Sequence, residues 1–332
     1  MKAVILAGGK GTRLKPYTTI LPKPLMPIGD MPILEILLRQ MKRAGIDEAV
    51  LTVGHLAELL RLFFRDGERL GLRIAYSYED APLGTAGPLS LVEGLSQTFL
   101  VANGDVLTTL PLANLLAHHR LSGAAATIAM HRRQVHIDLG VIQQNEQGHV
   151  TGYIEKPTYD FMVSMGIYVF NANILERRLS EGRPEKPRND FGKDVIPAML
   201  AASDRVYAYR FEGYWVDVGT IDSYWITSLE LLQPKPALDL YTDAWPVHTK
   251  SEERPPAKIG PQAKVVSSML SNGCVVRGVA INSVLSPGVY VSPGAVVQDS
   301  VIMNDAWIGP GARLDKVVVD KKAVIGAGAL VG

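Results

Sequence analysis

Residues 2–14 read KAVILAGGKGTRL, a short apolar run followed at once by three glycines in four positions. An apolar run of this length that ends in glycines is typical of a buried strand in a parallel sheet. Glycines let the backbone approach a ligand closely, and their N–H groups can point at phosphate oxygens. The stretch therefore predicts a central strand that leads into a phosphate-binding loop.

Apolar runs and helical patterns alternate from residue 2 to residue 102. Further strands are expected at 48–53, 73–77 and 98–102, and helices at 32–44, 56–70 and 88–96. This alternation predicts an α/β domain, doubly wound and Rossmann-like, with a mostly parallel sheet. Ligands bind such a sheet at the carboxyl ends of its strands, where Gly8 and Asn103 would both lie.

The pattern changes after residue 120, where short apolar segments follow one another with few helices between them. Extended segments are expected at 124–130, 139–143, 149–154 and 163–170, and the last helices at 191–202 and 221–232. These extended segments predict a lid or an antiparallel extension of the sheet.

The C-terminal part is a repeat of 17 residues. Three aliphatic columns recur at this spacing: Leu285, Ile302 and Val319; Val291, Ile308 and Ile325; Val297, Leu314 and Val331. Glycine or Pro-Gly at the corners between them predicts a left-handed parallel β-helix of hexapeptide repeats. We therefore expect an α/β domain at 1–233, a proline-rich linker at 234–258 and a β-helix domain at 259–332. Because each coil buries its column only against a neighbour, exposed end coils predict a homo-oligomer, a dimer or tetramer.

Composition excludes several classes of function. The 332 residues are 47% hydrophobic with a formal net charge of +1, so nucleic acid and anionic membranes are not expected partners. The single cysteine, Cys274, and the absence of a Cys/His cluster argue against disulfides and a zinc site. The apolar start is far shorter than a signal peptide or membrane span, so we expect a cytoplasmic protein.

The glycine loop matches neither of two common nucleotide-binding motifs. It is not a Walker A loop, because Lys10 is followed by Gly11, and it is not a GxGxxG fingerprint. Glycines alone could form an ordinary turn between strand and helix. Arg13, and Lys23 between two prolines, add positive charge and favour phosphate binding.

GGKGTRL (8–14) followed by PKPL (22–25) resembles the signature of the sugar-1-phosphate nucleotidyltransferases, the NDP-sugar pyrophosphorylases. Further segments agree with that family in order: PLGTAG (82–87), NGD (103–105), EKP (155–157), SMGIY (164–168) and YWVDVGT (214–220). The first half is similar to GDP-mannose and dTDP-glucose pyrophosphorylases. SMGIYVFNA, DFGKDVIP and YWVDVGTIDSYW are similar to ADP-glucose pyrophosphorylase.

The resemblance implies an in-line attack of a sugar phosphate oxygen on the α-phosphorus of a nucleoside triphosphate, with Mg²⁺ as cofactor. It assigns the metal to Asp105 and Asp217, although either aspartate could instead be a turn or capping residue. It makes Arg13, Lys23 and Asp105 the catalytic residues. The nucleotide-binding residues it implies are Leu6, Gly8, Gly9, Gly11, Thr12, Arg13, Lys23, Gly84 and Thr85. The residues it implies for the sugar phosphate are Gly140, Glu155, Lys156 and Ser164.

The resemblance leaves the substrates open. GTP with mannose 1-phosphate is the first expectation, and ATP or dTTP with glucose 1-phosphate is the alternative. Ser164 stands where many guanylyl- and thymidylyltransferases have Asn, a feature shared with the ADP-glucose branch. Two other classes are a non-catalytic regulatory subunit and a CoA-dependent acyltransferase; no histidine follows His248 to serve the latter as a base. His118 and His119 are expected on an exposed helix face, without a functional role.

Overall fold

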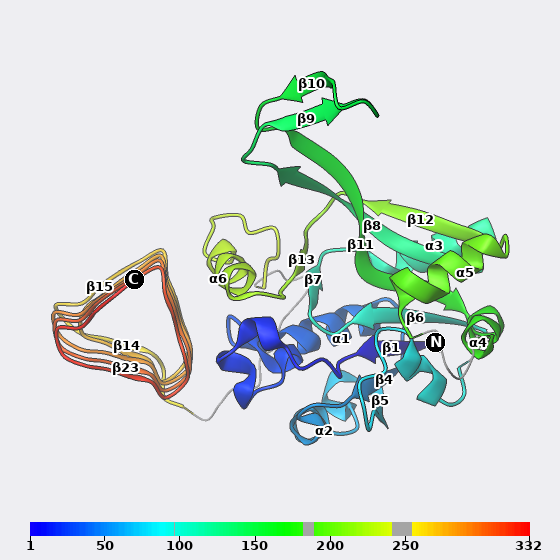
Figure 1. The fold of residues 1–332 in the computed structure, drawn as a ribbon. Helices are drawn as coiled ribbons and strands as arrows, with labels where there is room; N and C mark the ends of the chain where they lie inside the picture. Colours follow the sequence, from blue (N-terminus) through cyan, green and yellow to red (C-terminus); the bar gives the residue numbers. More distant parts are fainter. Residues whose placement is uncertain (96, 182–188, 241–253) are drawn as a thin grey trace.

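A seven-stranded sheet forms the centre of the N-terminal domain of the computed structural model, which describes residues 1–95, 97–181, 189–240 and 254–332. The strand order is β12-β8-β11-β6-β1-β4-β5 (Figure 1). The strands are β1 (Lys2–Leu6), β4 (Glu48–Val53), β5 (Arg73–Tyr78), β6 (Thr98–Asn103), β8 (Ala126–His136), β11 (Thr158–Asn171) and β12 (Val206–Phe211). Strands β6, β1, β4 and β5 are parallel, and β11 runs antiparallel to β6 and β8.

The carboxyl ends of β1 and β6 meet, as the sequence predicts. Leu6 is in register with Asn103 on one side and with Thr52 on the other. The glycine loop after β1 and the Asn103-Gly104-Asp105 segment after β6 therefore leave the sheet at the same edge.

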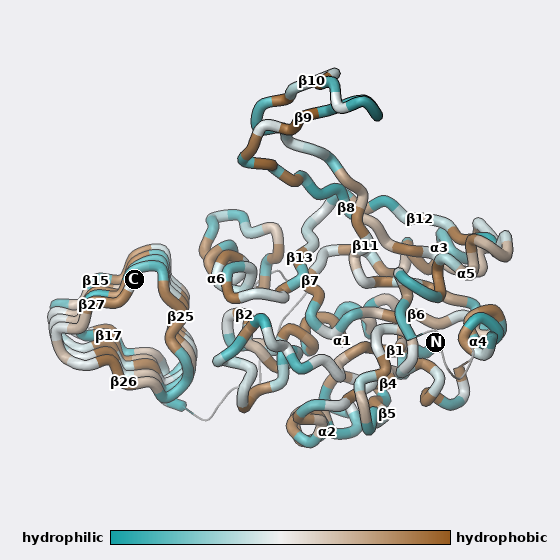
Figure 2. Tube along the Cα trace, viewed as in Figure 1, coloured by the Kyte–Doolittle hydropathy of each residue, from teal (hydrophilic) through white to brown (hydrophobic). Residues whose placement is uncertain are grey.

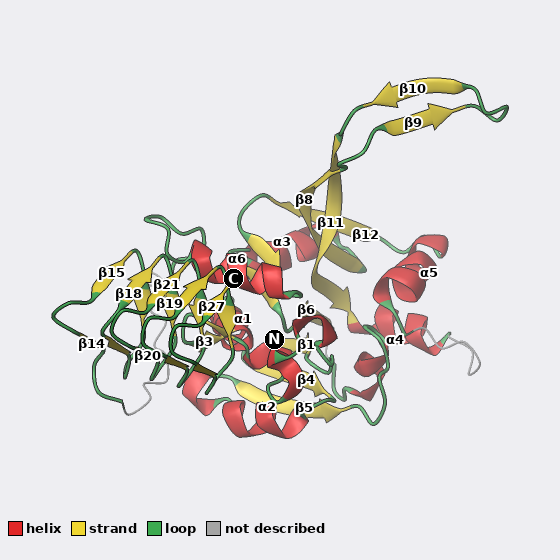
Figure 3. Ribbon diagram, turned by 60° about the vertical axis from the view of Figure 1, so that its left-hand side comes forward, coloured by secondary structure: helices red, strands yellow, loops and turns green. Residues whose placement is uncertain are grey.

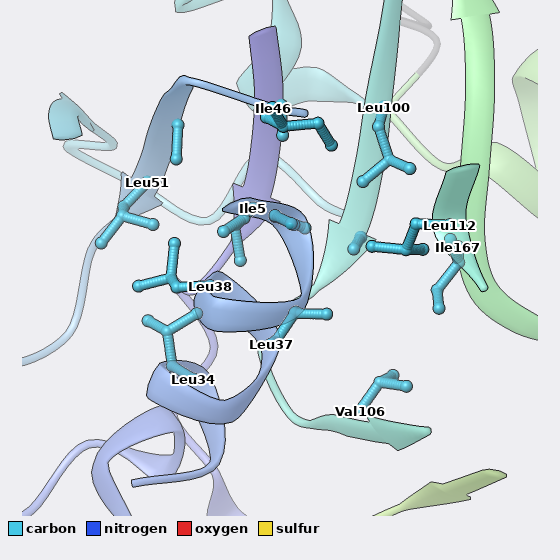
Figure 4. Close-up of a cluster of buried hydrophobic side chains, with 14 of the residues drawn as sticks. Ile5, Leu34, Leu37, Leu38, Ile46, Leu51, Leu100, Val106, Leu112 and Ile167 are labelled. Carbon is cyan, nitrogen blue, oxygen red and sulfur yellow. The ribbon is translucent and has the colours of Figure 1, made fainter. Parts of the chain in front are cut away.

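Six α-helices lie within the described residues. They are α1 (Ile33–Arg43), α2 (Ala57–Phe64), α3 (Leu112–Ser122), α4 (Ala172–Ser180), α5 (Ile196–Ala201) and α6 (Ile221–Glu230). Helix α1 packs Leu34, Leu37 and Leu38 against the sheet, where Ile5 and other strand residues are fully buried (Figure 4). Each such side chain stabilises the fold by about 1.5–3 kcal/mol. Within the described ranges, no helix has the length and apolar character needed to cross a bilayer.

Three helical predictions differ from the structure. Helix α2 ends at Phe64, where Arg65 (φ 50°) and Gly67 (φ 85°) take positive φ values that cannot continue a right-handed helix, and a 3₁₀ turn, Glu68–Leu70, follows. The helix expected at 88–96 is only a 3₁₀ turn, Gly87–Leu91, and Ser96 lies outside the described residues. The helix expected at 191–202 begins as a π-helical turn, Phe191–Val195, before α5.

The expectation that His119 faces solvent was also wrong. His119 is 2% exposed, because α3 turns it toward the sheet. Its ring nitrogens lie 2.9 Å from Thr127 Oγ1 and 3.2 Å from Asn171 Oδ1. Burial lowers the pKa of His119, so the neutral ring is favoured in the fold.

An arm, residues 132–162, projects from the domain (Figures 1 and 3). Its stalk is the paired ends of β8 and β11, where Thr158 to Ser164 are in continuous antiparallel register with His136 to Met130. Its tip is a two-stranded sheet of β9 (Val141–Gln144) and β10 (Val150–Ile154). The predicted antiparallel extension is thus present, and β11 begins five residues before the expected strand.

Residues 258–331 form a parallel β-helix whose three faces are three parallel sheets, so the fold class is the one predicted. The sheets contain β14 (Lys258–Ile259), β17 (Val275–Val276), β20 (Tyr290–Val291), β23 (Trp307–Ile308) and β26 (Val324–Ile325); β15 (Lys264–Val266), β18 (Val279–Ile281), β21 (Val296–Gln298), β24 (Arg313–Asp315) and β27 (Leu330–Val331); and β16 (Met269–Leu270), β19 (Val284–Leu285), β22 (Val301–Ile302) and β25 (Val318–Val319). The predicted columns are buried except in the last coil, where Val331 is 40% exposed because no further coil covers it. Part of the linker expected at 234–258 lies outside the described residues.

The β-helix packs against the N-terminal domain through the sheet that contains β19, β22 and β25. Val284, Val301 and Met303 share a buried cluster with Leu14 and Tyr17 of the glycine-loop region. The Tyr17 hydroxyl donates to the Val318 carbonyl at 2.7 Å, and the Trp225 indole donates to the Asp299 carbonyl at 2.7 Å. The segment that follows the glycine loop is therefore supported directly by the β-helix.

Candidate active site

The glycine loop after β1 is held close to Lys23. Gly11 has a φ of 59°, and a Cβ there would lie 3.2 Å from both Lys23 Cβ and Thr18 Cγ2. The Thr18 hydroxyl donates to the Gly11 carbonyl at 2.8 Å. A side chain at position 11 would be strained and crowded, so the loop needs glycine there. This geometry places the loop backbone beside a buried lysine.

Lys23 lies between the two aspartates assigned to the metal. Its Nζ is ion-paired with Asp105 Oδ2 and lies 3.4 Å from Asp217 Oδ1. The aspartates meet because β13 (Trp215–Asp217) pairs antiparallel with β7 (Val106–Thr108), which sets Asp217 opposite Val106. The Val218 amide also donates to the Asp105 carbonyl at 3.2 Å. Residues far apart in sequence thus form one charged group.

Asp105 is a carboxylate whose pKa depends on its burial and on two charged neighbours. Burial raises the pKa of Asp105, and the negative charge of Asp217 adds to this rise, whereas Lys23 opposes it. The Asp105 side chain is 21% exposed and that of Asp217 is 43% exposed, so the group opens to solvent on the Asp217 side.

The two carboxylates fit a divalent cation. Asp105 Oδ1 is buried and has no hydrogen-bond partner, so a strong acceptor is left without a donor. Mg²⁺ takes oxygen ligands and is usually held by one or two carboxylates, with phosphates and water completing its shell. The described residues contain no group of three or more His, Cys, Asp or Glu arranged for a metal. A metal ion bound to Asp105 and Asp217 would therefore depend on a bound substrate for further ligands.

Arg13 joins this group from the glycine loop. A Cβ on Gly219 would lie 3.0 Å from Arg13 Nη2 and 3.1 Å from Asp217 Oδ2, so the guanidinium lies beside Asp217 and Gly219 leaves it room. We call Arg13, Lys23, Asp105 and Asp217 the charge cluster. The sequence named all four, and the structure brings them together.

The other residues predicted to bind nucleotide lie around the same edge of the sheet. The Gly104 amide donates to the Leu6 carbonyl at 2.9 Å, and a Cβ on Gly8 would lie 2.6 Å from Glu79 Oε1. Gly9 and Thr12 belong to the same loop. Gly84 and Thr85 lie against a different segment, since a Cβ on Gly84 would lie 2.4 Å from the Asn189 carbonyl oxygen.

Sequence reasoning did not predict that Asp190 and Phe191 contact Thr85. Thr85 Oγ1 accepts from the Phe191 amide at 2.9 Å and donates to Asp190 Oδ2 at 3.3 Å. The Phe191 ring stacks on Tyr168, with centroids 4.9 Å apart. The segment DFGKDVIP entered the sequence analysis only through its resemblance to the family. Its Asp-Phe-Gly start, a polar and an aromatic residue before a helix, was the sequence feature that could have indicated this contact.

Ser164 lies at the inner end of the stalk, in a segment that contacts β13. Its hydroxyl donates to Tyr168 Oη at 3.0 Å, and the Trp215 indole donates to the Met165 carbonyl at 3.0 Å. Because Trp215 and Asp217 share β13, the Ser164 segment is connected to the strand that carries Asp217.

Gly140, Glu155 and Lys156 are not brought to the charge cluster. All three lie on the arm, and the side chains of Glu155 and Lys156 are exposed. Glu155 accepts a hydrogen bond from the Tyr153 hydroxyl at 2.9 Å, and Lys156 has a φ of 43°. The separation arises from the stalk, which β11 forms with β8 beyond Ser164.

Comparison with known proteins identifies both parts of the chain. Residues 2–234 match the nucleotidyl transferase family, and residues 255–332 match the GlmU-like C-terminal hexapeptide family. A glucose-1-phosphate adenylyltransferase of Clostridium perfringens is 35% identical over 91% of this chain and 82% of its own length. Enzymes with the same name from Thermotoga neapolitana (35% identical, 89% of this chain and 76% of the relative) and Geobacillus stearothermophilus (32%, 89% and 82%) are also similar.

The family model covers most of the chain, and the charge cluster lies within its match. These relatives carry both regions, since they align over the catalytic domain and the β-helix together. The chain belongs to the nucleotidyl transferase family of enzymes.

Proposed function

We propose that this enzyme forms a nucleotide-sugar and pyrophosphate from a nucleoside triphosphate and a sugar 1-phosphate, and that the pair is ATP with glucose 1-phosphate. The observation that carries the reaction is the charge cluster, in which Lys23 lies between Asp105 and Asp217 beside the glycine loop. The choice of substrates rests on the similar enzymes, which are named for glucose 1-phosphate and adenylyl transfer. They support this alternative over the first expectation of GTP with mannose 1-phosphate.

The reaction is a displacement at the α-phosphorus. A bond forms from a phosphate oxygen of the sugar 1-phosphate to the α-phosphorus as the bond to the bridging oxygen of the β-phosphate breaks, and pyrophosphate carries away that electron pair. The protein contributes by positioning and by holding charge. Glycine-loop amides and Arg13 bind the triphosphate, and Lys23 stabilises the negative charge that develops on the leaving oxygens.

Asp105 and Asp217 would hold Mg²⁺, which supplies positive charge to the phosphates when bound. Their own contribution is to keep Lys23 oriented, because each carboxylate faces its ammonium. Around the sugar, Ser164, Gly140 and Glu155 would contact hydroxyl groups and Lys156 the phosphate. Asp190, beside Thr85, is a further candidate for polar contact with substrate.

The enzyme is also proposed to be a homo-oligomer. The sheet of β19, β22 and β25 packs against the catalytic domain, whereas another face of the β-helix carries Tyr290 stacked on Trp307, with centroids 6.4 Å apart. Trp307 is 38% exposed, and such an aromatic surface favours contact between subunits.

The test is a matrix of five nucleoside triphosphates against several sugar 1-phosphates, with pyrophosphate release as the readout. ATP with glucose 1-phosphate should give the highest kcat/KM, and EDTA should abolish turnover. A higher value for GTP with mannose 1-phosphate would reverse the assignment of substrates. No release with any pair, from a correctly folded protein, would indicate the non-catalytic subunit instead.

A further inference from the structure

Lys23 lies in the space that the two aspartates of the charge cluster share. Its ammonium is ion-paired with Asp105 Oδ2 and lies 3.4 Å from Asp217 Oδ1. A divalent ion held by both carboxylates would use the same oxygens, because Mg²⁺ binds carboxylate oxygens at about 2.0–2.1 Å. Two cations that close together repel each other strongly. Lys23 and a divalent ion therefore compete for one position.

The fold fixes the point from which Lys23 reaches the aspartates. Lys23 begins the 3₁₀ turn Lys23–Leu25 and lies between Pro22 and Pro24, whose rings restrict the backbone. Its Cβ packs against the glycine loop, where a Cβ on Gly11 would lie 3.2 Å away. Behind this loop β1 pairs with β4, and both strands are mostly hydrophobic (Figure 2). The domain thus holds the stem of the lysine, and the change of partner is left to its flexible end.

The charges of the cluster balance one another. Lys23 and Arg13 bring two positive charges to the two carboxylates. The four charges cancel, so the cluster exerts little net attraction on a free divalent ion. A triphosphate would change this balance, because its oxygens add several negative charges and offer the ammonium another partner.

The carboxylates keep the capacity to bind a cation other than Lys23. Asp105 Oδ1 is buried and has no hydrogen-bond partner, although it is a strong acceptor. The Asp217 side chain is 43% exposed, so an ion can approach the cluster from solvent on that side. The ammonium therefore covers part of an acceptor set that a second cation could use in full.

We propose that Lys23 is the resident cation of the charge cluster, which keeps free divalent ions out and leaves the carboxylates when metal and triphosphate arrive together. The ammonium then moves to the phosphates, where the proposed function needs it. Metal binding and phosphate binding are coupled in this way, because both depend on the same change of partner by one lysine. The proposal rests on the proposed function for its metal, but it concerns what Lys23 does before substrate is bound.

The test measures the binding of free Mn²⁺ to the full-length protein by electron paramagnetic resonance, with no phosphate present. Mn²⁺ suits the same oxygen ligands as Mg²⁺. Lys23→Met removes the charge and keeps an unbranched side chain, so it should bind Mn²⁺ at least about tenfold more tightly than wild type. Lys23→Arg keeps the charge and should bind Mn²⁺ as weakly as wild type. Lys264→Met, at an exposed lysine of β15, is the matched control and should change nothing.

Thermal unfolding provides a second readout that does not depend on activity. Without metal, Lys23→Met leaves two neighbouring carboxylates without their ammonium and should unfold at a lower temperature than wild type. About 1 mM Mn²⁺ should raise the midpoint of this variant by at least about 3 °C and that of wild type by less than about 1 °C. The double variant Lys23→Met/Asp105→Asn should lose both the tighter binding and the rise with metal.

Two results would overturn the proposal. One is wild-type protein that binds free Mn²⁺ as tightly as Lys23→Met, and the other is Lys23→Arg that does so. A Lys23→Met protein that folds only with Mn²⁺ present supports the proposal. If it does not fold at all, Lys23→Gln, which is neutral and can still donate a hydrogen bond, takes its place in the same comparison.

Neither measurement uses a nucleotide, so the role of Lys23 and the proposed function can fail separately. Pyrophosphate release by wild type that EDTA abolishes, together with no gain of Mn²⁺ affinity in the neutral variants, overturns the role of Lys23 alone. Tighter Mn²⁺ binding in those variants, with no turnover of any substrate pair by wild type, overturns the proposed function and supports the role of Lys23.

Discussion

The charge cluster and the arm are both rich in residues expected to meet substrate, but they are held in different ways. Lys23 is 8% exposed, and the glycine-loop region and β13 contribute to a buried cluster that extends into the β-helix. The arm has a two-stranded tip and eight exposed hydrophobic residues. The groups proposed to hold the triphosphate are thus fixed by the fold of one chain. The predicted sugar-phosphate residues, in contrast, lie on an arm that its own chain leaves exposed.

The largest effect is expected at the charge cluster. Asp105→Asn removes the charge that pairs with Lys23 and that we propose holds the metal, so kcat should fall by about 10²–10³-fold. Thermal unfolding should stay close to wild type. Asp315→Asn, an exposed aspartate on the β-helix, is the control and should leave kcat unchanged. Near-normal pyrophosphate release from Asp105→Asn would remove this residue from the mechanism.

The same contrast explains which parts of the fold and of the candidate site could be predicted from the sequence. The strand at Lys2–Leu6 and the glycine loop are local patterns, and the 17-residue columns repeat, so both were predictable. The pairing of β13 with β7 is long-range, and only family motifs had linked Asp217 to Asp105. The stalk was not predictable, because Phe161 and Met162 are apolar yet 52% and 43% exposed. The hydrophobic periodicity of a sequence predicts burial only for segments that pack against a core.

A smaller effect should distinguish a histidine buried in the N-terminal domain from one on the arm. Burial lowers the pKa of His119, so the folded protein disfavours a proton that the unfolded chain takes up near its ordinary value of about 6.5. Stability should therefore be complete above that pH and fall as the pH drops below it, by at most about 1.4 kcal/mol per unit.

Urea unfolding at pH 7.5, 6.5 and 5.5 measures this dependence of the free energy of unfolding on pH. His119→Gln should lose part of the acid dependence, whereas His149→Gln, at an exposed position on the arm, should retain all of it. Equal acid dependence in wild type and His119→Gln would show that His119 is not the group responsible.

Two tyrosine hydroxyls provide the next comparison. Tyr17 is 8% exposed and donates to the Val318 carbonyl of the β-helix, whereas Tyr153 is 62% exposed and donates to Glu155 on the arm. Tyr17→Phe should lower the free energy of unfolding by about 0.5–1.5 kcal/mol, because the partly buried Val318 carbonyl loses its donor. Tyr153→Phe should have no measurable effect on unfolding. A larger loss from Tyr153→Phe would mean that the arm is buried in the subunit itself.

The smallest effect is expected from an ion pair on the stalk. Arg132 and Asp160 form two hydrogen bonds, at 2.8 and 2.9 Å, but both side chains are about half exposed, so solvent screens the attraction. Arg132→Ala should leave the free energy of unfolding within experimental error. Arg69→Ala is the contrasting variant, because Arg69 binds Glu35, which is 1% exposed. Its loss deprives a buried carboxylate of one partner and should cost about 1–3 kcal/mol. A loss of stability in Arg132→Ala as large as that in Arg69→Ala would show that the stalk is desolvated. A loss that appears only in the oligomer would show that a second subunit covers the stalk.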